Sequence, residues 1–176
     1  YHAGQGHVAV QKAIETLAGN PEIFHRTQQL VSVIGSAPGE DGHGITRESD
    51  TPIIVSISSG RLWEIMSESI RWQRWNAKAG EPKPSDPPPT VVRAVHARKE
   101  YRGVRQLDGV ITIPVLRPDG TLHAIPGYDP ATKLLYIPNG PIPEIPDHPT
   151  RNDAVSAAAA LIEVVLDFPF ADESGR

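Results

Sequence analysis

The residues best suited to chemistry in this chain are basic and aromatic side chains between positions 71 and 105. This stretch holds nine basic and three acidic residues, although the whole chain of 176 residues has a formal net charge of −4. Lysine and arginine neutralise nucleic-acid phosphates, and a tryptophan ring offers a face on which a base can stack. The pattern is typical of a DNA contact. The candidate residues are Arg71, Trp72, Arg74, Trp75, Lys78, Arg93, Arg98, Lys99, Arg102 and Arg105.

A second interpretation of the same stretch stays open. Trp72 and Trp75 could be core residues beside an ordinary solvated face of arginines, because large aromatic residues are commonly buried and charge runs are commonly solvated. The sequence pI of about 6.0 also argues against a dedicated DNA-binding domain. DNA is therefore a candidate partner that this stretch alone does not establish.

No spacing in the chain marks a common catalytic centre. Phosphate-binding loops, dinucleotide fingerprints, zinc-protease motifs and serine-nucleophile elbows are all missing from the sequence. The seven histidines form no pair at i, i+2 or i, i+4, and the absence of cysteine excludes disulfides and thiolate zinc sites. We expect no catalytic residue, no metal site and no cofactor. An independent hydrolase or nuclease would need a carboxylate or histidine cluster that sequence order hides.

The composition favours an α+β fold with a small mixed sheet, hairpins and about four helices, rich in loops and proline. Eighteen prolines and fifteen glycines exclude long helices over much of the chain, and with them an all-helical bundle. No apolar run approaches the roughly 20 residues that span a bilayer, and no basic-then-apolar signal segment opens the sequence. We therefore expect no membrane partner and a cytoplasmic location.

Periodicity and caps place the expected elements. Apolar residues at three- and four-residue spacing predict helices over 6–19, 58–70, 90–101 and 151–166, the last opened by a capping box at Thr150 and Asp153. Runs rich in β-branched residues predict strands. The expected strands are 23–25 and 30–34 as a hairpin, 52–57, 71–76 with one tryptophan on each side, 107–116 and 121–125 as a hairpin, and 133–137.

The chain is expected to form a single domain, 1–176, cut from a longer protein. Five prolines within 79–89 predict an extended connector and a possible internal division there, and five more within 138–149 predict a second connector. The segment 35–51 is rich in glycine and acidic residues, which predicts a mobile loop.

One segment carries a resemblance. The run LDGVITIPVLRPDGTLHAIPGYDPATKLLYIP (Leu107–Pro138) resembles a segment of primase-helicase-type replication proteins of phages, plasmids and other mobile elements. Two shorter pieces are similar in the same order: EIFHRTQQLVSV (Glu22–Val33) and DFPFADESGR (Asp167–Arg176). The resemblance implies an accessory region that precedes the ATPase of such a protein. It transfers no catalytic residue to this chain.

Under this resemblance the residues that match the motif are structural turn residues, namely Arg117, Asp119, Gly120, Gly127, Tyr128 and Asp129. Two hypotheses for the function follow. The chain contributes DNA contact or module linkage to a replication ATPase, or it is a protein-interaction or oligomerisation module without nucleic-acid binding. In the second case Trp72, Trp75 and the alanine-rich final helix pack against like subunits or the parent protein's own ATPase domain.

Overall fold

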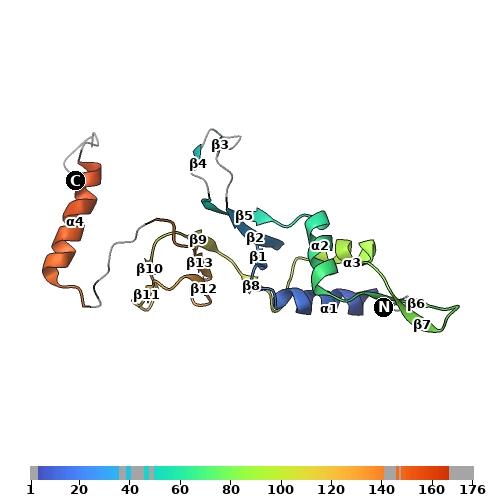
Figure 1. Ribbon diagram of the computed structural model, residues 1–176. Helices are drawn as coiled ribbons and strands as arrows, with labels where there is room; N and C mark the ends of the chain where they lie inside the picture. Colours follow the sequence, from blue (N-terminus) through green and yellow to red (C-terminus); the bar gives the residue numbers. More distant parts are fainter. Residues whose placement is uncertain are drawn as a thin grey trace. The chain divides into compact units, whose positions relative to one another are not determined.

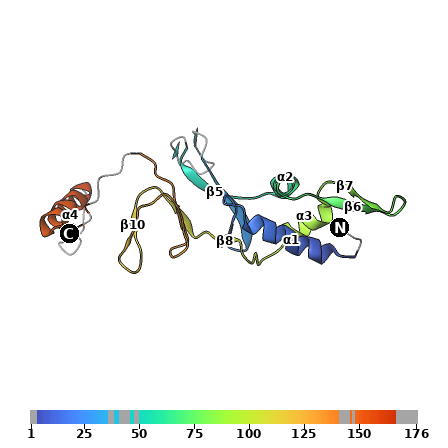
Figure 2. The same ribbon diagram turned by 60° about the horizontal axis from the view of Figure 1, so that its bottom comes forward.

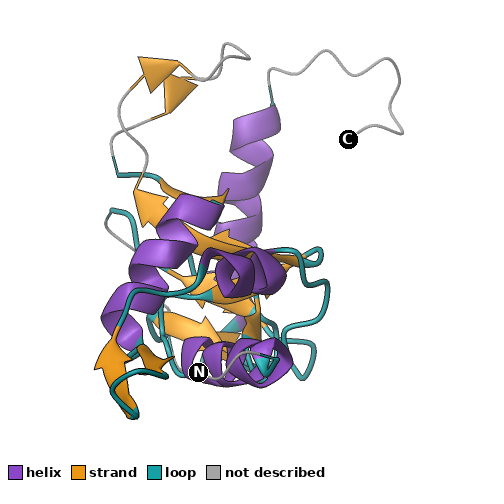
Figure 3. Cartoon of the chain, turned by 90° about the vertical axis from the view of Figure 1, so that its right-hand side faces the viewer, coloured by secondary structure: helices purple, strands orange, loops and turns teal. Residues whose placement is uncertain are grey.

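The computed structural model describes residues 4–35, 39–40, 46–47, 50–140, 146 and 148–166, and the chain divides into two compact units. The first unit is Tyr1–Gly140 and the second is Pro141–Arg176, so the boundary falls inside the proline-rich segment 138–149. Most of the second unit's connector lies outside the described residues. Helices and strands both contribute, with several small sheets, and the expected α+β class is confirmed (Figure 3).

Three helices of the first unit build its main core. They are α1 (Gly6–Ala18), α2 (Ser59–Ser69) and α3 (Pro89–His96), which contact one another (Figure 1). Their apolar residues recur every three or four positions and so line one face of each helix. The buried residues are Ala9, Val10, Ala13, Ile14, Leu17, Leu62, Ile65, Met66, Val91, Val92 and Val95.

Helix α3 ends five residues earlier than expected. The chain leaves the helix after His96, and Tyr101 folds back so that its hydroxyl donates to the carbonyl oxygens of Val95 and His96, each at 3.2 Å. The last carbonyls of a helix have no intrahelical partner, and this hydroxyl satisfies two of them. Tyr101 is 4% exposed and belongs to the helical core, so it fixes the C-terminal end of α3 to that core.

A mixed four-stranded sheet, ordered β5-β2-β1-β8, lies against the helical core. Strand β1 (Phe24–Arg26) pairs antiparallel with β2 (Gln29–Gly35) and parallel with β8 (Arg105–Gln106), and β2 pairs antiparallel with β5 (Pro52–Ser56). Alternation along β2 directs Leu30 into the helical core and Val31 into a second apolar cluster. Leu30 and Val31 therefore pack on opposite faces of this sheet.

The second apolar cluster joins this sheet to a three-stranded sheet ordered β12-β13-β9. Strands β12 (Gly127–Asp129), β13 (Leu134–Tyr136) and β9 (Gly109–Ile111) contribute Tyr128, Leu135 and Val110 to it. The expected strand 107–116 is wrong as one piece: β9 pairs parallel with β13, and β10 (Val115–Leu116) forms a separate hairpin with β11 (Leu122–His123). Pro114 lies between the two and cannot donate to a ladder.

The proline-rich segment 79–89 is not a simple connector. Strand β7 (Glu81–Pro84) pairs antiparallel with β6 (Gln73–Asn76), and no unit boundary falls there (Figure 2). Alternate residues of an edge strand turn their nitrogen away from the neighbouring strand, so prolines two positions apart can be tolerated. Pro82 and Pro84 have this spacing.

The remaining elements are peripheral. Strands β3 (Gly39–Glu40) and β4 (Thr46–Arg47) pair within the segment expected to be mobile, whose other residues between 36 and 49 lie outside the described part. Helix α4 (Arg151–Val165) in the second unit begins with the expected capping box of Thr150 and Asp153, and all its residues are exposed. No helix in the described part is long and apolar enough to cross a bilayer.

Candidate nucleic-acid interface

Trp72 is a core residue, which corrects its assignment as a stacking platform. The side chain is 9% exposed and belongs to the helical core. Its Nε1–H donates to the carbonyl oxygen of Met66 at 2.8 Å, and the N–H of Ser85 donates to the Trp72 carbonyl at 3.2 Å. A buried indole whose N–H is satisfied stabilises the packing of α2 and fixes the base of the β6–β7 hairpin. It presents no face to a base.

Arg105 is likewise built into the fold, so it leaves the set of candidate phosphate ligands. Its guanidinium donates to the carbonyl oxygen of Pro21 and lies over the rings of Phe24 and Tyr128, at 4.5 and 5.0 Å from their centroids. The Tyr128 hydroxyl donates to the Gln106 carbonyl at 2.7 Å, and burial raises the pKa of Tyr128. Stacked cation and rings close the edge of the second apolar cluster.

Three other basic residues gather where α3 ends, and we call Arg98, Lys99 and Arg102 the α3-end surface. Arg98 and Lys99 line a hollow of about 540 Å³ whose other walls are the β1–β2 turn and the segment before α2. All three basic residues also line a second hollow of about 640 Å³ with Gln11 and Glu100. Because the two hollows share Arg98 and Lys99, they adjoin one another along one basic surface.

Two side chains fix the backbone beneath this surface by bonding to backbone carbonyl oxygens. The imidazole Nε2 of His96 lies 3.1 Å from the Ile57 carbonyl oxygen, which fastens the end of α3 to the strand side of the first hollow. The hydroxyl of Tyr101 clasps the same helix end, and burial raises the pKa of that phenol. Arg98 and Arg102 therefore flank a buried anchor residue.

No described residue places a counter-charge in direct contact with the cations of the α3-end surface. Among the residues that the structure describes, none of Arg98, Lys99 and Arg102 forms a side-chain hydrogen bond or ion pair. Glu100 is the one acidic residue that lines the second hollow. Arg93 is also exposed and lies in the last turn of α3, outside both hollows.

A second basic group is the β6–β7 hairpin. Arg74, Trp75, Lys78 and Lys83 line one open hollow of about 570 Å³, and the indole of Trp75 is 45% exposed. Arg71, just before β6, instead lines a hollow beside α1 with Lys12. The structure therefore brings together two subsets of the predicted residues and places Arg71, Arg93, Trp72 and Arg105 elsewhere.

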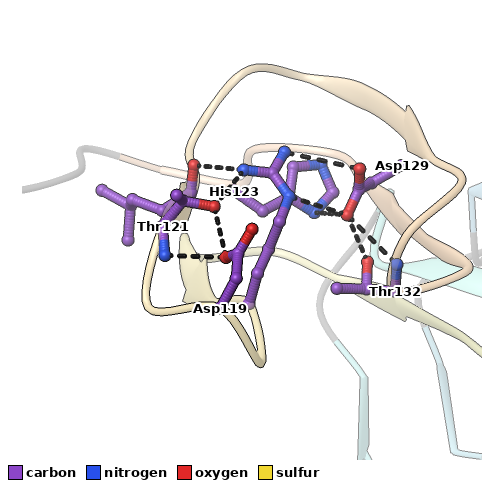
Figure 4. Close-up of polar contacts among 7 residues, drawn as sticks. Asp119, Thr121, His123, Asp129 and Thr132 are labelled. Atoms are coloured by element: carbon purple, nitrogen blue, oxygen red, sulfur yellow. Dashed lines mark hydrogen bonds and ion pairs between the residues drawn. The ribbon is translucent and has the colours of Figure 1, made fainter.

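A polar cluster that sequence reasoning treated only as turns joins the β10–β11 hairpin to β12 and the turn after it (Figure 4). The Nε–H of Arg117 donates to Oδ2 of Asp129 at 3.0 Å, and another guanidinium nitrogen donates to the Leu122 carbonyl at 2.9 Å. The Thr132 hydroxyl donates to the same Oδ2 at 2.7 Å. These bonds, with the guanidinium first, lower the pKa of Asp129 to about 2.

The geometry of this cluster is that of a structural ion pair with adjoining turns. Nδ1 of the buried His123 lies 4.0 Å from Oδ2 of Asp129, beyond hydrogen-bond distance. Asp119 accepts from the N–H and hydroxyl of Thr121, at 2.9 and 2.7 Å, which is ordinary turn chemistry. Within the described residues, no three histidine or acidic side chains lie close enough to hold a metal ion.

Comparison with protein-family models, with curated proteins and with solved structures found no match for this chain.

Proposed function

We propose that this chain is a non-catalytic accessory domain of a primase-helicase-type replication ATPase of a phage or other mobile element, acting in the cytoplasm, and that it contributes DNA contact. The context rests on the resemblance of Leu107–Pro138 to such proteins. The contact rests on one structural observation, the α3-end surface. Three exposed cations on a fixed backbone line adjoining hollows and have no ion-pair partner among the described residues. Duplex phosphates supply the missing anions without sequence selectivity.

The test is the salt dependence of DNA binding. Fluorescence anisotropy of a labelled duplex, titrated at several salt concentrations, gives the slope of log K against log salt. If Arg98 and Arg102 both contact phosphates, R98A/R102A weakens binding and reduces this slope by about two. The matched control is R61A/R151A, which removes the same charge from an arginine paired with Glu64 and from the start of α4. An unchanged slope in R98A/R102A, or no binding of the unaltered chain at low salt, would contradict the proposal.

A second candidate function has its own observation. Every described residue of α4 is exposed, including Val155, Leu161 and Ile162 at 60, 72 and 60%. A 15-residue helix that buries none of its residues within its own unit is marginal in water, so a partner that covers its apolar residues would stabilise it. This supports the protein-interaction module, with like subunits or the parent's ATPase as partner.

The two candidates are separated by sedimentation of the whole chain without DNA. If α4 associates with like subunits, the mass rises with concentration, L161D abolishes the rise, and S156D on the same helix does not. A mass that stays monomeric for the unaltered chain would exclude self-association, and the protein-interaction module would then require the parent's ATPase as its partner.

A further inference from the structure

The β6–β7 hairpin contributes nothing to either apolar core. Seven of its eight strand residues are exposed and Asn76 is half-buried. The residues between the two strands are exposed as well. An isolated two-stranded hairpin is at best marginally stable, so this one depends on its attachment to the core through Trp72 and Ser85. A segment that is costly to fold and buries no core has its use at its surface.

The tip of the hairpin has a defined shape. Oδ1 of Asn76 accepts from the backbone N–H groups of Lys78 and Ala79 at 3.0 and 3.4 Å, and the N–H of Gly80 donates to the Asn76 carbonyl at 2.9 Å. Gly80 has φ +67°, a conformation that glycine adopts without strain. The turn therefore presents Lys78 from an ordered backbone, which lowers the entropic cost of binding.

Like charges face each other across the ladder. Arg74 pairs directly with Lys83 in the register of β6 and β7, and such a pair is destabilising without a nearby anion. Neither side chain forms an ion pair with a described residue. Glu81, which pairs with Asn76 on the same face, is the one acid of the two strands. Three cations against one carboxylate leave the hairpin in need of an external anion.

Trp75 gives the hairpin a second kind of contact. Its register partner in the neighbouring strand is Pro82. The indole is exposed and lines the same hollow as the three cations. The described residues of the α3-end surface provide cations but no exposed tryptophan, tyrosine or phenylalanine ring, because Tyr101 is buried there. An aromatic ring can stack on a base only where the base is unstacked from its neighbours, as in single strands.

We propose that the β6–β7 hairpin binds single-stranded DNA, with Trp75 stacked on a base and Arg74, Lys78 and Lys83 on the flanking phosphates. This deepens the proposed function and rests on it, because it assigns a strand preference to one part of a DNA-contacting domain. The α3-end surface then holds the phosphate backbone of either form, and the hairpin adds selectivity for the unpaired strand.

The experiment uses tryptophan fluorescence of the whole chain, titrated with oligothymidylate of about ten nucleotides, a length within the range that single-strand-binding sites cover. A base stacked on Trp75 quenches its emission. W75F should lose most of the quenching and, because a phenylalanine ring still stacks but offers a smaller face, bind the oligonucleotide about threefold more weakly, with duplex affinity unchanged. W63F is the matched control, since Trp63 on α2 is 39% exposed and lies outside the hairpin.

The outcomes separate this inference from the proposed function. Equal quenching in W75F and the unaltered chain, or equal loss of single-strand and duplex affinity in W75F, overturns the hairpin assignment. If R98A/R102A still lowers duplex affinity in that case, the proposed function survives alone. Quenching of Trp75 by a polyglutamate peptide to the same extent as by oligothymidylate also overturns it, because the hairpin would then be an acidic-peptide site. R74A/K83A should reduce the salt slope for oligothymidylate by about one and a half.

Discussion

The hairpins β6–β7 and β10–β11 have the same simple architecture and opposite electrostatics. In β10–β11 the guanidinium of Arg117 is held by Asp129, Thr121 and Leu122, and Asp119 is held by Thr121. In β6–β7, Arg74 and Lys83 face each other, and neither has an ion-pair partner among the described residues. The charges of the β10–β11 turn are satisfied within the fold, with Asp129 of β12 as the partner of Arg117, whereas the β6–β7 hairpin leaves its positive charges to a ligand.

The contrast shows why charge in a sequence is a poor guide to binding until partners are known. Arg105 and Arg74 belong to the same basic stretch, yet Arg105 stacks on Phe24 and Tyr128 while Arg74 stays exposed. A cation that already has a partner stabilises the fold. A cation without a partner slightly raises the free energy of the fold when it lies beside another cation. A bound anion offsets this repulsion.

The comparison is tested most strongly by removing one arginine from each hairpin. Arg117→Ala deletes the ion pair and the bond to the Leu122 carbonyl, leaving the mostly buried Asp129 carboxylate without its cation. We expect the largest loss of unfolding free energy among the variants discussed here, read from the urea midpoint. Arg74→Ala should change it by no more than about 0.5 kcal/mol. Equal effects would show that the two hairpins do not differ as described.

Tryptophan substitutions give the next largest expected difference. Trp72→Phe removes the donor to the Met66 carbonyl in the core and should cost about 1–3 kcal/mol. Trp75→Phe removes an exposed ring and should cost less than about 0.5 kcal/mol. Urea unfolding followed by circular dichroism measures both. A destabilising Trp75→Phe would place Trp75 in the packing and weaken its assignment to a base.

Acid should weaken the β10–β11 side specifically. The pKa of Asp129 is lowered from an ordinary 3.8 to about 2, chiefly by the bond from Arg117. A depressed carboxyl pKa contributes stability that is full above the unfolded value and is lost as pH falls through the folded value. The urea midpoint should therefore fall between about pH 4 and pH 2, and this fall should be smaller in Arg117→Ala. If the urea midpoint depends on pH equally in the unaltered chain and in Arg117→Ala, the ion pair with Arg117 is not the cause of the acid effect.

A last test lies outside both hairpins. Thr150→Ala removes the side-chain oxygen that accepts from the Asp153 N–H at the start of α4, at a cost of about 1 kcal/mol to that helix. Amide exchange should quicken in residues 151–166 and stay unchanged in both hairpins, because α4 belongs to a separate compact unit. Faster exchange at residues 73–84 would show a coupling that the two-unit description lacks.

Local signals predicted much of the fold. Helices α1, α2 and α4 begin and end within about two residues of the expected positions, since periodicity and caps such as Ser58 and Thr150 are written in adjacent residues. The proline-rich composition of 79–89 gives no signal for strand β7, because proline usually excludes a segment from a sheet. The expected helix 90–101 differs from α3, because the position of Tyr101 over the helix end depends on tertiary packing.

The candidate site was only partly predictable. Alternation along 71–76 placed Trp72 and Trp75 on opposite sides, and the structure buries one and exposes the other, but the sequence does not say which. Arg105 and the pair Arg117–Asp129 acquire their partners through contacts 12 or more residues away. Spacing in the sequence carries no signal for such contacts, so a basic stretch could not be divided into structural and available residues beforehand.

The most direct test of the central claim is a nuclear magnetic resonance titration of the ¹⁵N-labelled 19.1-kDa chain with oligothymidylate. We expect amide shifts to change at residues 73–84 and 98–102 and to stay constant in the β10–β11 hairpin, because, of these three regions, the first two present cations that form no ion pair with a described residue. Changes confined to β10–β11, or none at low salt, would contradict the account.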